Sequence, residues 1–316
     1  MSEKIINSRV RVETIGEEAD DQRIDNYLLR HLKGIPRSHV YRILRRGEVR
    51  VNGGRVKPVY RLQVGDKVRI PPVRMVSAAP VQTLSNAHRQ QLTESIIYED
   101  DALLVINKPS GLAVHGGSGI SLGVIEQLRL ARPKQKGLEL VHRIDRETSG
   151  LLMIAKRRSV LRRLHELQRR HAIEKSYLAL VHGDWPENRM RVNVPLKKNQ
   201  AQGGERLVRP DPEGKKALTL FRIKEQFSDS MLVEAVLKTG RTHQIRVHAQ
   251  YLGTPILGDS KYSDDQTRQL SRQLGLKRLF LHAEKLSFEW GESGGRLQLQ
   301  APLEQPLVNI LSQLRI

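Results

Sequence analysis

Cysteine is absent from this 316-residue chain. Without a thiol the protein can form no disulfide, no cysteine-ligated zinc or iron–sulfur site and no cysteine nucleophile. Histidine offers no substitute as a metal ligand. His165-Glu166 starts like the zinc motif H-E-x-x-H, but Arg169 stands where the second histidine is needed. We therefore expect no metal site.

Long hydrophobic runs and nucleotide-binding motifs are also missing. No stretch approaches the roughly eighteen apolar residues of a membrane-spanning helix, and residues 1–18 lack the apolar core of a secretory signal. Neither G-x-G-x-x-G after a strand nor G-x-x-x-x-G-K-[ST] occurs, so no nucleotide cofactor is indicated. With 38% hydrophobic and 28% charged residues, we expect a soluble cytoplasmic protein with no membrane partner.

Acidic residues are few beside basic ones. The chain has 54 Lys and Arg against 34 Asp and Glu, a net charge of +20. A charge so far from zero attracts polyanions, and the release of counterions from phosphates favours a nucleic acid as partner over a merely basic surface. The excess is uneven: residues 21–75 contain 14 basic and 4 acidic residues, a net charge of +10, which is half of the total.

This basic segment has the pattern of two helices followed by a small sheet. Residues 22–32 and 36–46 have apolar residues at helical spacing. On the second helix, Arg42, Arg45 and Arg46 share a face away from the apolar stripe. The Asn52-Gly53-Gly54 turn is typical of a tight hairpin. Three short strands are expected, at residues 48–51, 55–58 and 67–70.

Two short helices and a hairpin with an arginine face resemble the S4 RNA-binding domain. The likeness covers about residues 22–70, including the run IPRSHVYRILRRGEVRVNG, and implies docking on an RNA backbone. The residues implied in RNA contact are Arg37, Arg42, Arg45 and Arg46. We place an S4-like domain at residues 1–75 and a proline-containing linker at residues 71–94.

Residues 95–316 form the second expected domain, for which the pattern favours an α+β fold. Residues 124–132 and 159–170 have helical spacing. Strands are more frequent: two within residues 96–111, then residues 177–181, 217–223, 231–237 and 287–290. Because the strands outnumber the helices and do not alternate with them, we expect a mixed, mostly antiparallel sheet.

Three polar runs in this domain could carry chemistry. They are Asn107–His115 (NKPSGLAVH), His142–Gly150 (HRIDRETSG) and Thr239–His248 (TGRTHQIRVH). The second run superficially matches the catalytic loop of protein kinases, but Gly150 stands where the kinase asparagine belongs and no D-F-G occurs. Each run alone is typical of a polar turn.

Together, in this order and at these separations, the three runs resemble the RluA family of pseudouridine synthases. The likeness covers about residues 95–305, and H-R-[LI]-D-x-x-T-S-G is its most specific part. Runs such as AVHGGSG, GVIEQLR and GERLVRP resemble family members that carry an S4 domain and act on large-subunit (23S) ribosomal RNA. The resemblance implies an RNA-modifying isomerase without a cofactor, and a monomer is the simplest expectation.

The same resemblance implies roles for individual residues. It makes Asp145 the nucleophile and Arg246 the salt-bridge partner that keeps this carboxylate ionised in a dry pocket. It assigns Tyr177 to stacking on the uracil, and Arg143 to the space that a flipped base leaves. Further substrate contacts are implied for His142, Thr148 and Ile245.

Some of these residues have plainer interpretations. From the pattern alone, Tyr177 is an ordinary core aromatic, and Arg246 is a surface arginine on a strand. Residues 156–170 carry seven basic residues and one acid. We expect Arg158 and Arg162 there to contact phosphates, with a solvated helix face as the alternative.

Two other functions compete with the isomerase. A non-catalytic RNA-binding or ribosome-assembly protein could keep the fold, but it need not retain Asp145, Tyr177 and Arg246 together. A nuclease or phosphoryl-transfer enzyme would call for a carboxylate cluster holding Mg²⁺, and Glu147 is the one acid near Asp145 in the run.

Overall fold

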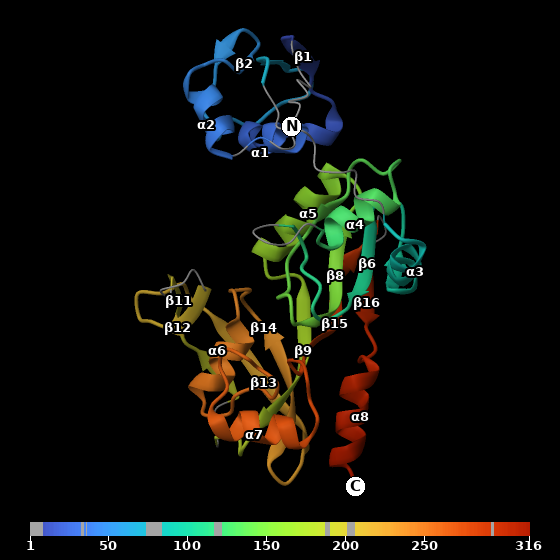
Figure 1. Ribbon diagram of the computed structural model, residues 1–316, viewed down its shortest axis with the longest axis vertical. Helices are drawn as coiled ribbons and strands as arrows, with labels where there is room; N and C mark the ends of the chain where they lie inside the picture. The colour runs from blue at the N-terminus through green and yellow to red at the C-terminus, as the bar shows by residue number, and fades with distance from the viewer. Residues whose placement is uncertain are drawn as a thin grey trace, which may run out of the picture. The chain divides into compact units, whose positions relative to one another are not determined.

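The computed structural model describes residues 9–32, 35, 37–73, 84–116, 122–186, 190–200, 206–291 and 294–316 (Figure 1). The chain divides into two compact units, one within residues 1–85 and one formed by most of residues 86–316. Among the described helices, none is long and apolar enough to cross a membrane.

The first unit is a four-stranded antiparallel sheet with two helices. Its strands run in the order β1-β4-β2-β3. The predicted helices and the third predicted strand are confirmed, whereas the hairpin strands are shorter than predicted, and β1 and the 3-10 helix η1 were not expected. The elements are β1 (Arg11–Thr14), η1 (Glu17–Ala19), α1 (Ile24–His31), α2 (Arg37–Arg45), β2 (Arg50–Val51), β3 (Gly54–Arg55) and β4 (Lys67–Ile70).

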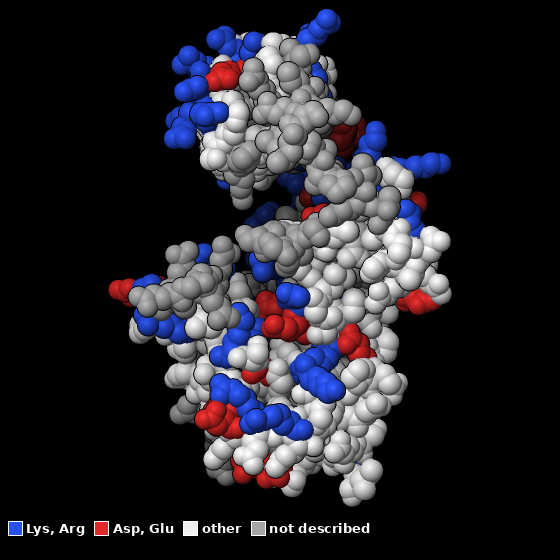
Figure 2. All heavy atoms as spheres, viewed as in Figure 1, with Lys and Arg blue, Asp and Glu red and all other residues white. Residues whose placement is uncertain are grey.

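The amphipathic pattern of α2 decides which face it buries. Val40, Ile43 and Leu44 are at most 2% exposed and join the core of this unit. Arg42, Arg45 and Arg46 point to solvent, as their spacing predicts. The side chain of Arg37 lies outside the described residues. Figure 2 shows Lys and Arg side chains gathered on one side of this unit.

The predicted hairpin turn is also confirmed. Asn52 and Gly53, between β2 and β3, have φ angles of 50° and 80°. Two consecutive positive φ angles define the turn that matches the twist of paired strands, which is why Asn-Gly is favoured there.

The second unit is built on one large mixed sheet. Its strand order is β10-β13-β14-β9-β15-β8-β6-β5, with β16 added to β15 and β7 to β8. Among the described strands, β8 and β15 pair in parallel and the other neighbours pair antiparallel, as the sequence predicts. The strands are β5 (Ile96–Glu99), β6 (Leu103–Lys108), β7 (Glu139–Leu140), β8 (Ser149–Ala155), β9 (Glu174–His182), β10 (Arg191–Asn193), β13 (Leu218–Gln226), β14 (Ser230–Leu237), β15 (Leu281–Trp290) and β16 (Gly295–Gln300).

Helices cover this sheet, and a separate hairpin stands beside it. On one face, Leu161 and Leu164 of α5 pack against Leu103 of β6 and Met153 of β8. The strand β8 is buried along its whole length, so its opposite face is covered as well. These elements are α3 (Asn86–Glu94), α4 (Val124–Ala131), α5 (Arg158–Arg169), α6 (Gln244–Tyr251), α7 (Asp265–Gln273), α8 (Gln305–Leu314) and the hairpin β11 (Leu196–Gln200) and β12 (Arg206–Pro210).

Two sequence-based interpretations are wrong. Residues 86–94, placed in the linker, form the helix α3. The run around Arg246, interpreted as an alternating strand, forms the helix α6. Residues 244–249 of this helix are all buried, so the sequence carries no exposed polar face from which a helical period could be recognised.

The centre of the sheet positions residues of the second polar run beside β15 and β9. Ala283 on β15 pairs with Tyr177 on β9 and with Gly150 on β8. Gly150 and Tyr177 are therefore two strand spacings apart, about 10 Å. A Cβ atom on Gly150 would lie 2.3 Å from the carbonyl oxygen of Ala283, and its φ angle is 105°. Glycine thus allows the start of β8 to approach β15 closely at this position.

Candidate active site

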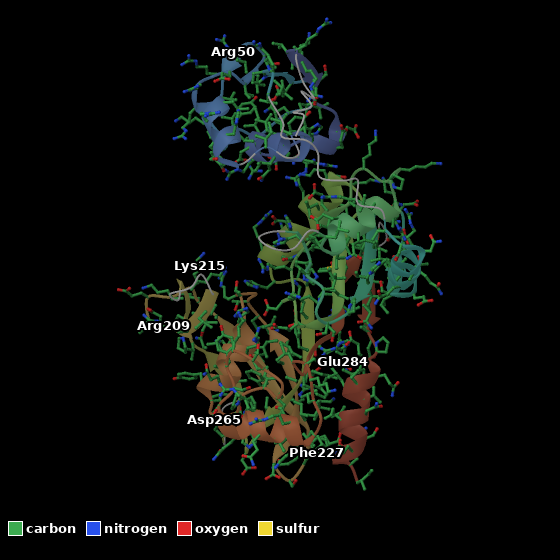
Figure 3. The ribbon with its side chains drawn as sticks, viewed as in Figure 1. Arg50, Arg209, Lys215, Phe227, Asp265 and Glu284 are labelled. Atoms are coloured by element: carbon green, nitrogen blue, oxygen red, sulfur yellow. The ribbon has the colours of Figure 1, made fainter. Side chains whose placement is uncertain are left out.

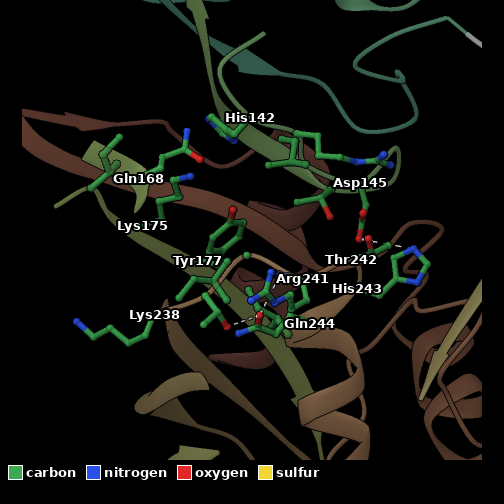
Figure 4. Close-up of a pocket in the computed structure, with 18 of the residues that line it drawn as sticks. His142, Asp145, Gln168, Lys175, Tyr177, Lys238, Arg241, Thr242, His243 and Gln244 are labelled. Carbon is green, nitrogen blue, oxygen red and sulfur yellow. Dashed lines mark hydrogen bonds and ion pairs between the residues drawn. The ribbon is translucent and has the colours of Figure 1, made fainter. Parts of the chain in front are cut away.

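A pocket of about 640 Å³ opens where this loop, β9 and the start of α6 meet. It collects all seven of the residues implied in catalysis and base handling (Figure 4), although they come from three separate parts of the chain. The seven are His142, Arg143, Asp145, Thr148, Tyr177, Ile245 and Arg246.

Asp145 projects into the pocket with its carboxylate facing two basic side chains. Its Oδ2 lies 3.9 Å from Nη1 of Arg246 and 3.9 Å from Nε2 of His243. Among the described residues it accepts no hydrogen bond. In Figure 4 the carboxylate points toward the His243 ring. The Asp145 carboxylate therefore lies near positive charge without a short hydrogen bond to occupy its oxygens.

Arg246 is buried, with 1% of its side chain exposed. Its closest partner is Asp259, which was not expected from the local sequence. Nε and Nη2 donate to the two carboxylate oxygens of Asp259 at 2.7 and 2.6 Å. Burial alone would lower the pKa of Arg246, but its hydrogen bonds to Asp259 raise it. Arg246 is therefore a fixed cation whose remaining nitrogen, Nη1, faces Asp145.

Tyr177 occupies the middle of the pocket. In Figure 4 it lies between Asp145 and His243 on one side and Lys175 and Gln168 on the other. Burial, reinforced by the negative charge of Asp145, raises the pKa of the Tyr177 phenol. The ring therefore offers an apolar face and a protonated hydroxyl rather than a base.

Lys175 stands two residues before Tyr177, so both side chains leave β9 on the same face. Burial lowers the pKa of Lys175 to about 8. The spacing K-x-Y on a strand that ends in the pocket is the signal that could have identified this residue from the sequence.

The loop that carries Asp145 is fastened to the end of β6. Lys108 is fully buried, and its ammonium donates to the carbonyl oxygens of Pro109, Leu112 and Arg146 at 2.7, 2.8 and 3.1 Å. Ser110 adds a hydrogen bond of 2.7 Å from its hydroxyl to the Glu147 carbonyl. The first polar run therefore supports the second, which explains why both occur in one protein.

The four residues implied in substrate binding and base flipping differ in how they line the pocket. His142 is held by the backbone, since its Nε2 accepts from the Met153 amide at 3.2 Å. Burial lowers the pKa of His142 well below its usual range, so this ring is neutral. Thr148 and Ile245 are buried in the wall, with exposures of 2% and 4%. Arg143, by contrast, is exposed at the pocket. A side chain expected to enter the space that a flipped base leaves must be accessible in this way.

Of the basic residues that the sequence predicts to contact RNA or substrate, Arg143 and Arg246 line the pocket, but those on α5 do not. Arg158 and Arg162 lie on α5 but do not line the pocket, whereas Arg169 at the other end of α5 does. Arg241, from the loop before α6, lines it too. Further cations flank the hairpin β11–β12, where Arg209 and Lys215 project outward (Figure 3).

Comparison with known proteins follows the same division of the chain. Residues 102–251 match the family described as RNA pseudouridylate synthase, and residues 22–68 match the S4 domain. A ribosomal large subunit pseudouridine synthase C of Pasteurella multocida is 53% identical over 99% of this chain and 96% of its own length. The Escherichia coli protein of that name is 50% identical over 97% of both chains.

A solved structure has a fold similar to that of this chain. Human RNA pseudouridylate synthase domain containing 4 superposes with a TM-score of 0.60 at 30% identity, covering 73% of this chain and 96% of its own. The chain belongs to the RNA pseudouridine synthase family, with an S4 domain at its N-terminal side.

Proposed function

We propose that this protein isomerises uridines to pseudouridine in large-subunit ribosomal RNA, with Asp145 as the nucleophile. The observation that carries the proposal is the Asp145 carboxylate, which shares one pocket with Arg246 and Tyr177 in a polar loop anchored to the central sheet. Relatives that are about half identical along their whole length are named for the large ribosomal subunit, which supports that RNA as the substrate.

The reaction needs no co-reactant, because its atoms balance within the substrate. The bond between C1′ of the ribose and N1 of uracil breaks, and a bond between C1′ and C5 forms. C5 loses a proton and N1 carries one in the product. Asp145 takes part either as a nucleophile at C1′ or C6 or as a base at C2′, and an ionised carboxylate serves each of these routes.

Arg246 and Tyr177 prepare the pocket for this chemistry. Arg246 keeps Asp145 ionised through its Nη1, 3.9 Å away, while Asp259 balances the remaining charge. Tyr177 stacks on the uracil and offers its hydroxyl to the base edge.

The target base must leave the RNA stack to reach Asp145. Arg143, exposed at the pocket, fills the vacated space with its planar guanidinium. His142, Thr148 and Ile245 line the wall against which the flipped nucleoside rests.

The S4 unit supplies affinity for the RNA backbone. Arg37, Arg42 and Arg45 of α2 and Arg46 directly after it contact phosphates, and Arg158 and Arg162 of α5 add further contacts. The protein acts as a monomer in the cytoplasm, and light scattering of the purified chain tests the first of these two statements.

The central test is the Asp145→Asn variant. It should abolish pseudouridine formation, detected by carbodiimide labelling and primer extension on ribosomal RNA, while RNA binding persists because the pocket keeps its shape. The matched control is Glu147→Gln, which changes a half-exposed carboxylate in the same loop and should retain activity. Wild-type modification levels with Asp145→Asn would disprove the assignment of the nucleophile.

A further inference from the structure

His243 is the second basic group beside Asp145, and the proposed reaction assigns no role to it. It precedes α6 in a left-handed conformation, with a φ angle of 54°. Such a conformation is uncommon for a residue other than glycine and is maintained where surrounding contacts determine it. Only 12% of the side chain is exposed, and Nε2 lies 3.9 Å from Oδ2 of Asp145.

Contacts on the far side of the ring fix where its proton sits. Nδ1 of His243 lies 2.7 Å from the hydroxyl of Tyr262. The oxygen of that hydroxyl already accepts the backbone N–H of Val208 at 3.0 Å. The hydroxyl hydrogen is therefore free to be donated to Nδ1, an arrangement that leaves Nδ1 unprotonated. A neutral ring in this arrangement carries its proton on Nε2, which faces Asp145.

The charges around the ring favour the neutral form. Burial lowers the pKa of His243, and the negative charge of Asp145 opposes this effect. Arg246 and Lys261 lower the pKa further, while Asp259 works against them. The net direction is downward, so at neutral pH the ring presents an N–H dipole rather than a full positive charge.

We propose that His243 is a positioning residue for Asp145: it holds the carboxylate through a neutral Nε2–H, in a tautomer that Tyr262 and the Val208 amide select. This inference rests on the proposed role of Asp145. Arg246 already supplies one fixed cation. A second full charge would stabilise the carboxylate further and make it a poorer nucleophile, whereas a neutral donor fixes its direction at less cost in reactivity.

The distance of 3.9 Å exceeds that of a hydrogen bond. Hydrogen bonds at catalytic groups are often long in free enzymes and shorten when substrate closes the site. The flipped nucleoside enters the same pocket, so the Nε2–H to Oδ2 contact tightens as the substrate seats.

The tautomer can be measured without any activity. Two-bond ¹H–¹⁵N spectra of histidine-labelled full-length protein distinguish a protonated Nε2 from a protonated Nδ1. We expect the His243 signals to show protonation at Nε2, and the Tyr262→Phe variant to lose this preference. This variant keeps the ring that packs against Arg246 and removes only the hydroxyl. A wild-type His243 that is protonated at Nδ1 would overturn the inference.

Kinetics test the consequence for Asp145. Under single-turnover conditions with saturating enzyme, His243→Phe should slow pseudouridine formation about 10- to 100-fold, the range expected for one lost hydrogen bond to a charged group. The dissociation constant for the RNA should change by less than about threefold, because the group acts on the chemical step. His243→Gln, whose amide N–H can take the place of Nε2–H, should recover most of the rate.

The outcomes separate this inference from the proposed function. Full single-turnover rates for His243→Phe in an active wild-type background would overturn the positioning role alone. Equal losses in the Phe and Gln variants would also overturn it, since packing rather than the N–H would then matter. A wild-type protein that forms no pseudouridine would instead refute the proposed function, and the tautomer result would still stand.

Discussion

The guanidinium of Arg246 shows at the scale of one residue how the site divides its charges. Two of its nitrogens are committed to Asp259, whose Oδ1 also accepts the backbone N–H groups of Lys261 and Tyr262 at 2.8 and 3.1 Å. The pair is buried and fully bonded, so neither charge is left uncompensated. The third nitrogen, Nη1, faces two carboxylates: it lies 3.5 Å from Oε2 of Glu147 and 3.9 Å from Oδ2 of Asp145.

We predict that Asp259→Asn damages both activity and stability. Arg246 would lose its charged partner inside the protein and turn toward Asp145, tying up the nucleophile. Breaking a buried ion pair by removing one partner costs about 3–5 kcal/mol, and a misplaced catalytic group costs about 100-fold in rate. Urea denaturation and single-turnover assays measure the two effects.

The control for this prediction is Glu147→Gln, because Glu147 also faces Nη1 of Arg246, at 3.5 Å, but is 41% exposed. An exposed pair contributes at most about 1 kcal/mol to stability. The free energy of unfolding of this variant should therefore be close to that of the wild type. Equal stability of the two variants would mean that Asp259 does not hold Arg246.

At this scale the sequence predicts the chemistry better than the geometry. Asp145 and Arg246 were singled out through their runs and Tyr177 through the family resemblance alone, and all three line one pocket. Asp259 was missed because nothing in the local sequence links it to an arginine 13 residues earlier. His243 was part of a quoted run, but only the fold reveals which side of its ring meets Asp145.

At the scale of elements, hydrogen bonds from Lys108 join the end of β6 to the loop that carries Asp145. Three carbonyl oxygens surround its ammonium, and two of them belong to the first polar run while the third belongs to the loop. Burial lowers the pKa of Lys108 to about 7.

This shift predicts a specific dependence of stability on pH. Between pH 7 and about 10.4, the ordinary pKa of lysine, the unfolded chain binds a proton at this position that the folded chain binds less tightly. Stability contributed by Lys108 therefore rises with pH across this window, by at most about 1.4 kcal/mol per pH unit. Lys108→Met should flatten the increase in urea-unfolding free energy between pH 7.5 and 9.5.

The same substitution should also lower stability at every pH, because three carbonyl groups lose their donor, each at a cost of about 1 kcal/mol or more. Lys277→Met, at an exposed lysine of the same unit, is the control and should reproduce the wild-type curve. An unchanged pH dependence in Lys108→Met would show that this lysine titrates normally in the folded protein.

Four helices with a clear apolar period were predicted, whereas α8, which buries Leu307, Ile310 and Leu311 at helical spacing, was missed, as were elements without such a period. The helices α1, α2, α4 and α5 have such a period, and the structure contains them within two residues of the predicted bounds. The helix α7 buries Thr267 and Ser271, and α3 buries Leu92 among polar neighbours, so neither offers an apolar stripe to recognise. The strand β1 was missed because its buried and exposed residues do not follow the hydrophobic pattern.

At the scale of the whole molecule, two units with separate cores share the work. The first has its own hydrophobic cluster, which includes Leu28 and Val40, and the second has the cluster around Leu103 and Met153. Composition alone predicted the division, since half of the net charge lies in residues 21–75. Which uridine enters the pocket depends on how the folded RNA meets both units, and motifs do not encode that geometry.

The docking role of the first unit predicts a change in salt dependence that can be measured in the full-length chain. Replacing Arg42, Arg45 and Arg46 with Gln removes three exposed cations of α2 and leaves its buried face intact. Each phosphate contact contributes about 0.7 to 0.9 to the slope of log K against log salt, so the slope should fall by about two to three.

Lys224, Arg272 and Lys277, exposed cations that do not line the pocket, provide a matched triple Gln control with the same loss of net charge. If both triple variants flatten the slope equally, binding follows total charge and α2 has no special part in it. The other outcome is that only the α2 variant flattens the slope, while its single-turnover rate at saturating enzyme stays near that of the wild type. In that case the first unit docks the RNA and the second performs the chemistry.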